Sequence, residues 1–141
     1  MTFPFKLVNE ITTPVTFYDI GISAGFPSPA DDYNERKLDL NDLLIKHPEA
    51  TFFAKASGDS MIGARIHDGD MLIIDRSVAA SDGKIVIAVV NGELTVKRFK
   101  LIGRSAQLHS ENPKYAPITL CEGDNISIWG VVTNVVHSCD Q

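Results

Sequence analysis

The dipeptide Asn91-Gly92 stands between two stretches of strand-like sequence, and it constrains the fold more than any other feature of the chain. Both residues tolerate positive φ, which the tightest β-hairpin turns require. Residues 84–90, before the dipeptide, are nearly all β-branched or small, and residues 93–101, after it, also have strand character. The sequence therefore predicts an antiparallel hairpin over residues 84–101.

Four further segments have the length and composition of short strands, and one segment has a helical pattern. The predicted strands cover residues 51–56, 71–75, 106–109 and 126–136. A short helix is predicted over residues 38–47, because its leucines follow helical spacing, Asp39 can cap its start and Pro48 ends it. Many short strands with little helix predict a mostly β fold, built as a compact antiparallel β domain.

The chain before this helix differs from the rest in composition. Residues 1–34 hold four prolines and show neither helical nor alternating periodicity. Prolines at this density break helices and remove donors from a β-ladder. We therefore expect an extended N-terminal arm over residues 1–34, followed by a β domain over residues 35–141.

The charge balance and the apolar runs exclude several classes of protein. The chain has 13 basic and 18 acidic residues among 141, a formal net charge of −5. Proteins that bind DNA on their own usually carry a basic excess, because phosphate neutralisation supplies most of their affinity, so no direct DNA binding is expected. No run approaches the roughly 20 apolar residues of a membrane-spanning helix. The N-terminal sequence also lacks the pattern of a secretory signal.

The two cysteines, Cys121 and Cys139, are too few for a disulfide framework. Neither lies in a CxxC motif, and we expect no metal site and no cofactor. Two free thiols are typical of a reducing compartment, so we expect a cytoplasmic protein.

Residues 57–62, Ser-Gly-Asp-Ser-Met-Ile, place Ser60 in a tight turn directly after a predicted strand. A hydroxyl on such a turn is held clear of the sheet. The backbone N–H groups beside it, at Asp59 and Met61, can point at a developing oxyanion. The same composition is also typical of an ordinary capped turn. Ser60 is therefore a candidate nucleophile that needs a partner base.

The candidate for that base is Lys97, in the predicted strand 93–101. The four histidines have no local partner that would indicate a catalytic triad. Strand alternation places Lys97 on the same face as Phe99 and Leu101. Burial there would lower the lysine pKa from about 10.4 and give a neutral amine that can accept a serine proton. The alternative is that the side chain extends to the sheet edge and keeps its charge in water.

Three separated motifs resemble those of the LexA/UmuD family of self-cleaving serine–lysine proteins, the S24 peptidases. They are SGDSM at residues 57–61, DGD at residues 68–70 and LTVKR at residues 94–98. The order and spacing of the motifs agree with the family, most closely with its UmuD-type members, and the resemblance covers nearly the whole chain. It implies a β domain of the LexA/signal-peptidase type and the activity of a self-cleaving serine endopeptidase.

The functional residues of that family match particular positions of this chain. The resemblance implies that Ser60 is the nucleophile, that Lys97 is the general base and that the chain cuts itself between Ala24 and Gly25. Ala24 and Gly25 are small, so the scissile carbonyl can approach a nucleophile closely. The next residue precedes a proline and is biased towards the extended conformation that a protease site accepts.

The resemblance also implies a cellular role and partners. Only 24 residues precede the matched bond, too few for the winged-helix domain of LexA-type repressors, so we expect the UmuD role. In that role a RecA filament on single-stranded DNA stimulates cleavage by favouring the conformer with the arm in the cleft. The trimmed homodimer then serves a UmuC-type Y-family DNA polymerase in SOS mutagenesis. The long apolar segment 126–136 also favours a homodimer, because an exposed strand is usually paired or covered.

Two other functions are compatible with the same residues. A signal-peptidase-like processing enzyme also uses a serine–lysine dyad on a related β core, although its membrane anchor has no counterpart in this sequence. A non-catalytic dimeric binding module would keep the fold and only recruit a polymerase. Cleavage of signal-peptide substrates in trans would indicate the first, and an unchanged mass after long incubation would indicate the second.

Overall fold

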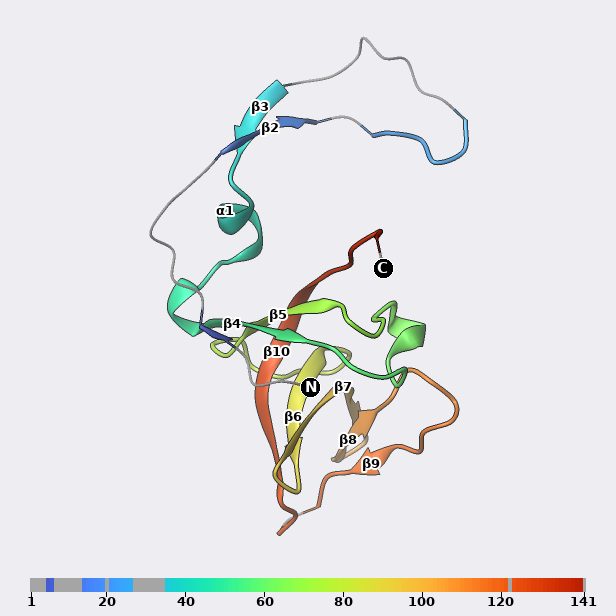
Figure 1. The fold of residues 1–141 in the computed structure, drawn as a ribbon. Helices are drawn as coiled ribbons and strands as arrows, with labels where there is room; N and C mark the ends of the chain where they lie inside the picture. Colours follow the sequence, from blue (N-terminus) through green and yellow to red (C-terminus); the bar gives the residue numbers. More distant parts are fainter. Residues whose placement is uncertain (1–4, 7–13, 20, 27–34, 122, 141) are drawn as a thin grey trace. The chain divides into compact units, whose positions relative to one another are not determined.

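The structure, a computed structural model, describes residues 5–6, 14–19, 21–26, 35–121 and 123–140. Its contacts group the chain into two units (Figure 1), Met1–Leu7 with His47–Gln141 and Val8–Lys46. The fold is mostly β and antiparallel, as the sequence predicts, and the described residues include one short α-helix.

The larger unit contains an eight-stranded sheet with the strand order β1-β4-β5-β10-β6-β7-β8-β9, in which all neighbouring pairs are antiparallel. The strands are β1 (Phe5–Lys6), β4 (Thr51–Lys55), β5 (Met71–Asp75), β6 (Ile85–Val90), β7 (Glu93–Ile102), β8 (Ser105–His109), β9 (Ile118–Thr119) and β10 (Ile126–Val136), with the 3-10 helices η1 (Pro48–Ala50) and η2 (Ile62–Ala64). All six predicted strands are present, with ends within one residue of the prediction. The two-residue strand β9 was not predicted.

The hairpin predicted at Asn91-Gly92 joins β6 to β7. Val90 pairs with Glu93, and the two turn residues Asn91 and Gly92 have φ of 51° and 82°. Positive φ at both central positions is the geometry of a type I′ turn, whose twist matches that of the flanking strands. The turn thereby fixes the register of β7, the strand that carries Lys97.

Strand β10 lies between β5 and β6 in the sheet. Its first half pairs with β6, with a register shift between Ile128 and Gly130, and its second half pairs with β5, with a register shift between Val132 and Asn134. Glycine permits this close packing, since a Cβ at Gly130 would lie 2.7 Å from Ile74 Cγ2. Because β10 is paired along its length by strands of the same chain, the argument that this apolar segment needs a second copy is wrong.

The core of the larger unit lies on both faces of β6. Ile87 packs in one buried cluster with Leu72 and Met61, whereas Val86 packs in a second cluster with Leu108. Successive residues of a strand point to opposite faces of the sheet. A strand that is buried on both faces must therefore be apolar throughout, and this explains the unbroken apolar sequence of β6.

The smaller unit contains a strand pair and a helix. Its elements are β2 (Val15–Tyr18), β3 (Glu35–Leu38) and α1 (Leu40–Leu44). Asp39 caps the helix as predicted, because its carboxylate accepts the backbone N–H of Asn41 at 2.9 Å. The helix is shorter than predicted at both ends, since Leu38 belongs to β3 and the chain is already extended at Ile45, with φ −118° and ψ 99°.

The N-terminal arm is less irregular than its sequence indicates. Strands β1 and β2 were not predicted, because each is only two to four residues long and pairs with a strand far along the chain. So few residues leave no periodic pattern to recognise. The contacts also group β3 with the arm, whereas the sequence suggested a division into residues 1–34 and 35–141. The start of the independently folding domain stays a prediction.

We expect residues 25–141 to stay folded without the first 24 residues. In the part of the chain that the structure describes, every buried hydrophobic side chain lies after Gly25. The large sheet would lose only its two-residue edge strand β1. A fragment that begins at Gly25 should therefore unfold cooperatively in urea, with a free energy of unfolding lower by about 1–2 kcal/mol. A non-cooperative transition would instead show that the arm belongs to the core.

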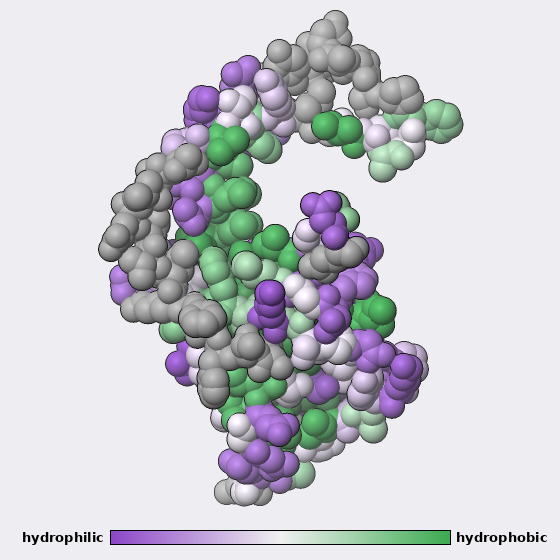
Figure 2. Space-filling model, viewed as in Figure 1, coloured by the Kyte–Doolittle hydropathy of each residue, from purple (hydrophilic) through white to green (hydrophobic). Residues whose placement is uncertain are grey.

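The surface mixes side chains of different polarity. On the face shown in Figure 2, hydrophilic and hydrophobic side chains are interspersed over the larger unit. Its large exposed apolar residues include Leu101 and Ile102 at the end of β7. None of the helices among the described residues is long and apolar enough to cross a membrane.

Candidate active site

Ser60 lies in the loop between β4 and β5, just before η2. After it, Met61 and Ile66 are each 2% exposed and pack into the core. Before it, Gly58 has a φ of 87° and donates its backbone N–H to Asp68 Oδ1 at 2.8 Å. The turn is therefore anchored on both sides of Ser60, which holds the hydroxyl in a defined place.

A second loop, residues 110–115, packs against the Ser60 loop through Asp59. The Tyr115 hydroxyl donates to Asp59 Oδ1 at 2.6 Å, and Lys114 Nζ lies 3.0 Å from Oδ2. These hydrogen bonds, that of Tyr115 first, hold the pKa of Asp59 below its usual range. Asn112 Nδ2 donates to the Asp59 carbonyl at 2.9 Å. The Asp59 side chain thus tethers the two loops, while the oxyanion role expected for the N–H groups of Asp59 and Met61 stays a prediction.

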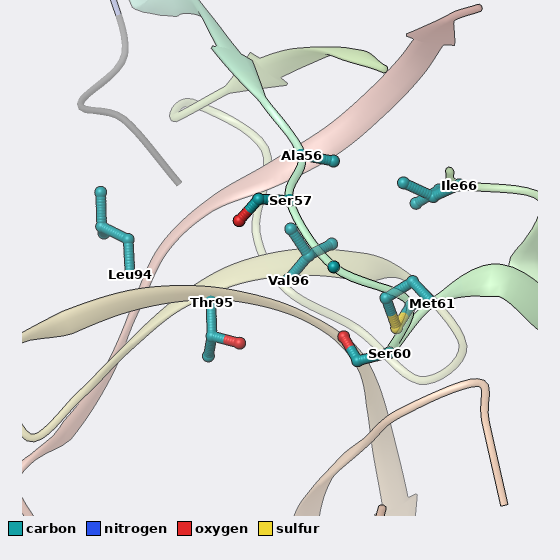
Figure 3. A pocket seen from close by; sticks show the side chains of 9 residues that line it. Ala56, Ser57, Ser60, Met61, Ile66, Leu94, Thr95 and Val96 are labelled. Atoms are coloured by element: carbon teal, nitrogen blue, oxygen red, sulfur yellow. The ribbon is translucent and has the colours of Figure 1, made fainter. Parts of the chain in front are cut away.

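Ser60 lines a pocket of about 180 Å³ between its loop and β7 (Figure 3). The lining residues are Ala56, Ser57, Gly58, Ser60, Met61, Ile66, Leu94, Thr95 and Val96. The hydroxyls of Ser60 and Thr95 point toward one another from the loop and from the strand. The pocket therefore presents hydroxyl groups beside the apolar side chains of Met61, Ile66, Leu94 and Val96.

Lys97 follows Thr95 by two residues on β7 and is buried, with 9% of the residue exposed. Its Nζ donates a hydrogen bond to Ser110 Oγ at 2.7 Å and lies 5.7 Å from the centre of the Tyr115 ring. Burial lowers the pKa of Lys97, because desolvation disfavours the charged ammonium. The burial expected from strand alternation is confirmed, and a lysine extended into water at the sheet edge is excluded.

Ser60 and Lys97 line adjoining pockets rather than one. Lys97 lines a hollow of about 470 Å³ that shares Leu94 and Thr95 with the pocket of Ser60. Within the described ranges, the hydrogen bond of Lys97 Nζ goes to Ser110, and none joins it to Ser60. Catalytic hydrogen bonds are often long in a free enzyme and tighten when the substrate binds. The serine–lysine dyad therefore stays a prediction.

Ala24 and Gly25 lie in the smaller unit, in an exposed bend. The Gly25 backbone N–H donates to Ser23 Oγ at 3.2 Å. A Cβ at Gly25 would meet no atom within 4 Å, so this glycine is not required by packing. The bond between the two residues is accessible, as a protease substrate must be, and its cleavage stays a prediction.

Sequence reasoning missed Ser110, the residue that holds the Lys97 amine. A signal was present in the two-residue turn Gly103-Arg104, across which Ile102 pairs with Ser105. Arg98 pairs with His109 in the same register, which brings Ser110, the next residue, beside Lys97. Counting the strand pairs outward from this turn would have indicated the contact.

The comparisons with known proteins agree with this fold and these motifs. The chain matches the family described as Peptidase S24-like over residues 16–133. It is 46% identical over 122 residues to protein MucA of Salmonella typhimurium, covering 85% of this chain and 82% of MucA. It is 49% identical over 115 residues to protein ImpA of Escherichia coli, covering 81% of this chain and 77% of ImpA. It is 38% identical over 119 residues to the LexA repressor of Acidithiobacillus ferrooxidans, covering 82% of this chain and 58% of the repressor.

The chain belongs to the S24 peptidase family, since the family match covers most of its length. The resemblance inferred from three short motifs is thereby confirmed. Its similarity to MucA and ImpA places it among the UmuD-type, self-cleaving proteins of SOS mutagenesis.

Proposed function

We propose that this chain is a cytoplasmic serine endopeptidase that cuts its own Ala24–Gly25 bond, with Ser60 as the nucleophile and Lys97 as the general base. The observation that carries the proposal is the buried amine of Lys97. Its pKa is lowered by burial, and its strand also lines the pocket of Ser60. A neutral amine beside a serine pocket is the arrangement that activates a serine without a histidine.

In the proposed reaction, Ser60 Oγ attacks the carbonyl carbon of Ala24 while Lys97 Nζ takes the hydroxyl proton. The C–N bond then breaks, and Nζ gives the proton to the leaving amine of Gly25. Water then attacks the Ser60 ester while Nζ takes its proton, and Nζ returns this proton to Ser60 Oγ as the C–O bond breaks and the acid of Ala24 is released. The backbone N–H groups beside Ser60 would bind the oxyanion of each tetrahedral intermediate.

Ser110 acts in this scheme as a positioning residue for the amine. Its Oγ accepts a hydrogen bond from Lys97 Nζ at 2.7 Å, which holds one N–H of the amine and, in the neutral form, leaves the nitrogen lone pair available. The proposal requires that Lys97 Nζ comes within hydrogen-bond distance of Ser60 Oγ when the substrate is bound. In this scheme the hydrogen bond between Ser60 and Lys97 forms only when the peptide is bound, as is common for catalytic hydrogen bonds.

The experiment that tests the proposal is an intact-mass measurement on the purified full-length chain during incubation at alkaline pH. We expect two products, Met1–Ala24 and Gly25–Gln141, in equal amounts. Cleavage at a different bond would refute the assigned site and leave the serine–lysine assignment standing. A mass that stays unchanged would refute self-cleavage by the isolated chain.

One observation favours a second candidate, a non-catalytic dimeric module that recruits a polymerase. The Lys97 amine is hydrogen-bonded to Ser110 and not to Ser60, an arrangement in which the dyad would stay open. The two candidates differ in one measurable property. A chain that keeps its full mass even with RecA filaments present, and that still binds a polymerase, is the binding module.

We also propose that a RecA filament on single-stranded DNA accelerates the cleavage, and that the trimmed form serves a UmuC-type Y-family polymerase. The filament would supply no catalytic group and would raise the population in which the arm occupies the pocket. Its effect should therefore vanish in a chain without Ser60 Oγ. Acceleration of cleavage by filament that remained in such a variant would show a contaminating protease.

The proposed homodimer rests on the family resemblance alone. Strand β10 gives no separate reason for a dimer, because it is paired within the chain. We expect light scattering at micromolar concentration to give about twice the chain mass of 15.4 kDa. The same measurement on the Gly25–Gln141 fragment should also give a dimer. A monomeric mass for both forms would contradict this part of the proposal.

A further inference from the structure

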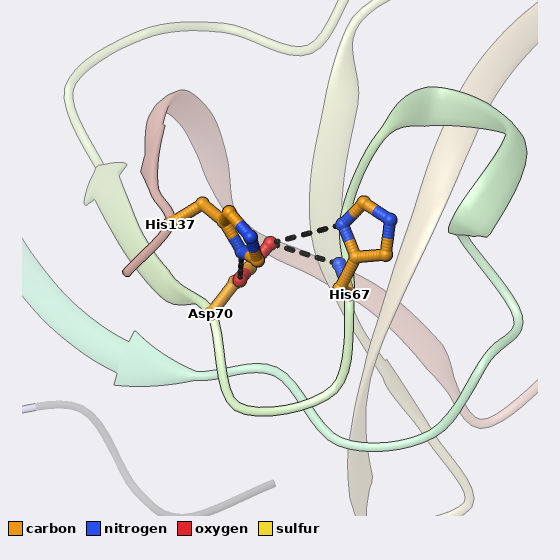
Figure 4. Close-up of side chains that lie close together, drawn as sticks. All are labelled: His67, Asp70 and His137. Atoms are coloured by element: carbon orange, nitrogen blue, oxygen red, sulfur yellow. Dashed lines mark hydrogen bonds and ion pairs between the residues drawn. The ribbon is translucent and has the colours of Figure 1, made fainter. Parts of the chain in front are cut away.

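A cluster of two histidines and an aspartate lies outside the pocket of Ser60 (Figure 4). His67 and Asp70 belong to the segment between η2 and β5, and His137 directly follows β10. One ligand atom from each of the three residues lies within 4.8 Å of the others. The two imidazole rings stand 5.2 Å apart, on either side of the carboxylate. Residues distant in sequence are thereby brought together around one buried anion.

Asp70 is completely buried, and both of its oxygens face this cluster. Oδ1 lies 2.6 Å from His137 Nδ1, while Oδ2 accepts the His67 backbone N–H at 2.8 Å and lies 3.7 Å from His67 Nδ1. Burial alone would raise the pKa of Asp70, but the hydrogen bonds from His67 and His137 outweigh it, and the pKa is lowered. The carboxylate is therefore an anion at neutral pH.

A buried carboxylate elsewhere in the sheet shows what a purely structural arrangement looks like. Asp75 is satisfied by one histidine, His47 at 2.6 Å, and by the backbone and hydroxyl of Ser77. Asp70 is likewise satisfied by one histidine, His137, together with a backbone N–H. The imidazole of the second histidine, His67, lies 3.7 Å from Asp70 Oδ2, which is too far for a hydrogen bond. Hydrogen bonding to Asp70 therefore does not explain why the His67 ring lies beside this carboxylate.

We propose that His67, Asp70 and His137 bind a divalent transition-metal ion of the zinc class. Imidazole nitrogen and carboxylate oxygen are ordinary zinc ligands, and three protein ligands leave one position for water. Zinc bonds of about 2.0–2.1 Å would place the ligand atoms roughly 3.4 Å apart. Both histidine side chains are 48% exposed, so their rings can turn into this geometry. The ion would replace the direct hydrogen bond between Asp70 and His137.

Such an ion would join the end of β10 to the loop that carries Ser60. Asp70 is already bound to the start of that loop, because its carbonyl accepts the Ala56 N–H at 2.8 Å and Gly69 N–H donates to the Ala56 carbonyl at 2.8 Å. The cluster does not line the pocket of Ser60. We therefore assign the ion a stabilising role for the loop and no part in the bond cleavage. This site departs from the expectation of no metal site, which sequence reasoning reached because His67 and His137 lie far apart in the chain.

The test uses the full-length chain with Cys121→Ser and Cys139→Ser, because both thiols are exposed and would bind zinc themselves. Calorimetric titration with zinc alone should show one ion per chain with a micromolar or tighter dissociation constant. His67→Ala and His137→Ala should each weaken binding at least tenfold, since each leaves two ligands. His47→Ala removes the comparable pair with Asp75 and should leave zinc binding unchanged.

Two further measurements separate a lost site from a lost fold. Excess zinc should raise the thermal unfolding midpoint of the parent, the full-length chain with both cysteines replaced by serine, by several degrees. It should change the midpoints of the His67→Ala and His137→Ala variants little. In the parent itself, zinc should shift the ring nitrogen resonances of His67 and His137 and leave those of His47 in place. Binding weaker than about 100 µM in the parent, equal binding in the histidine variants, or unmoved His67 and His137 resonances would each overturn the proposal.

Discussion

Replacing Ser60 by alanine is expected to stop self-cleavage, with a rate at least roughly a thousandfold below that of the unmodified chain. The substitution removes the oxygen that would form the ester with Ala24 and leaves the anchors of the loop in place. Those anchors are Met61 in the core and Asp59 at the second loop. The readout is intact mass over an incubation long enough for the unmodified chain to be converted completely.

Ser57 provides the matched control for this substitution, because its side chain lines the same pocket three residues earlier. Ser57→Ala should cleave within about tenfold of the unmodified rate. A second control, Gly25→Glu, keeps the pocket intact and should also block cutting, because a charged side chain beside the scissile bond hinders its entry. If Ser60→Ala cleaves as fast as the unmodified chain, the nucleophile is another group.

The strands of this fold could be predicted from the sequence because their signals are local. Asn91-Gly92 fixes a turn by its own φ preferences, and β6 is apolar throughout because it is buried on both faces. The two strands of the arm escaped prediction for the opposite reason. β1 and β2 are too short to show a period, and they exist only because β4 and β3 supply partners far along the chain.

The residues of the candidate site likewise differ in whether a local pattern could reveal them. Ser60 and Lys97 were found from a turn motif and from strand alternation, both of which are properties of a few neighbouring residues. Ser110 was missed because its contact with Lys97 depends on the register between β7 and β8. The cluster around Asp70 depends on still more distant chain segments. Residues that form a local motif can thus be predicted from the sequence, whereas their hydrogen-bond partners depend on how distant strands pair.

The rate of self-cleavage is also expected to depend strongly on pH, through the amine of Lys97. Only the neutral amine can accept the Ser60 proton, so the cleavage rate should follow the deprotonated fraction of one group. Burial lowers the pKa of Lys97 from its ordinary value of 10.5. The rate without any partner protein should therefore rise with pH, by up to about tenfold per pH unit, and reach half of its plateau value below pH 10.5. The measurement is the initial rate of fragment formation at a series of pH values.

Lys97→Arg is the matched variant for this experiment, because it keeps a long cationic side chain that stays protonated in proteins. It should lose cleavage at every pH, together with the alkaline rise, as should Lys97→Ala. Ser110→Ala removes the hydrogen-bond partner of the amine and should keep a rising profile with a displaced midpoint and a lower rate. A Lys97→Arg chain that still cleaved with the same pH dependence would show that another group takes the proton, since a guanidinium that stays charged offers no lone pair to receive it.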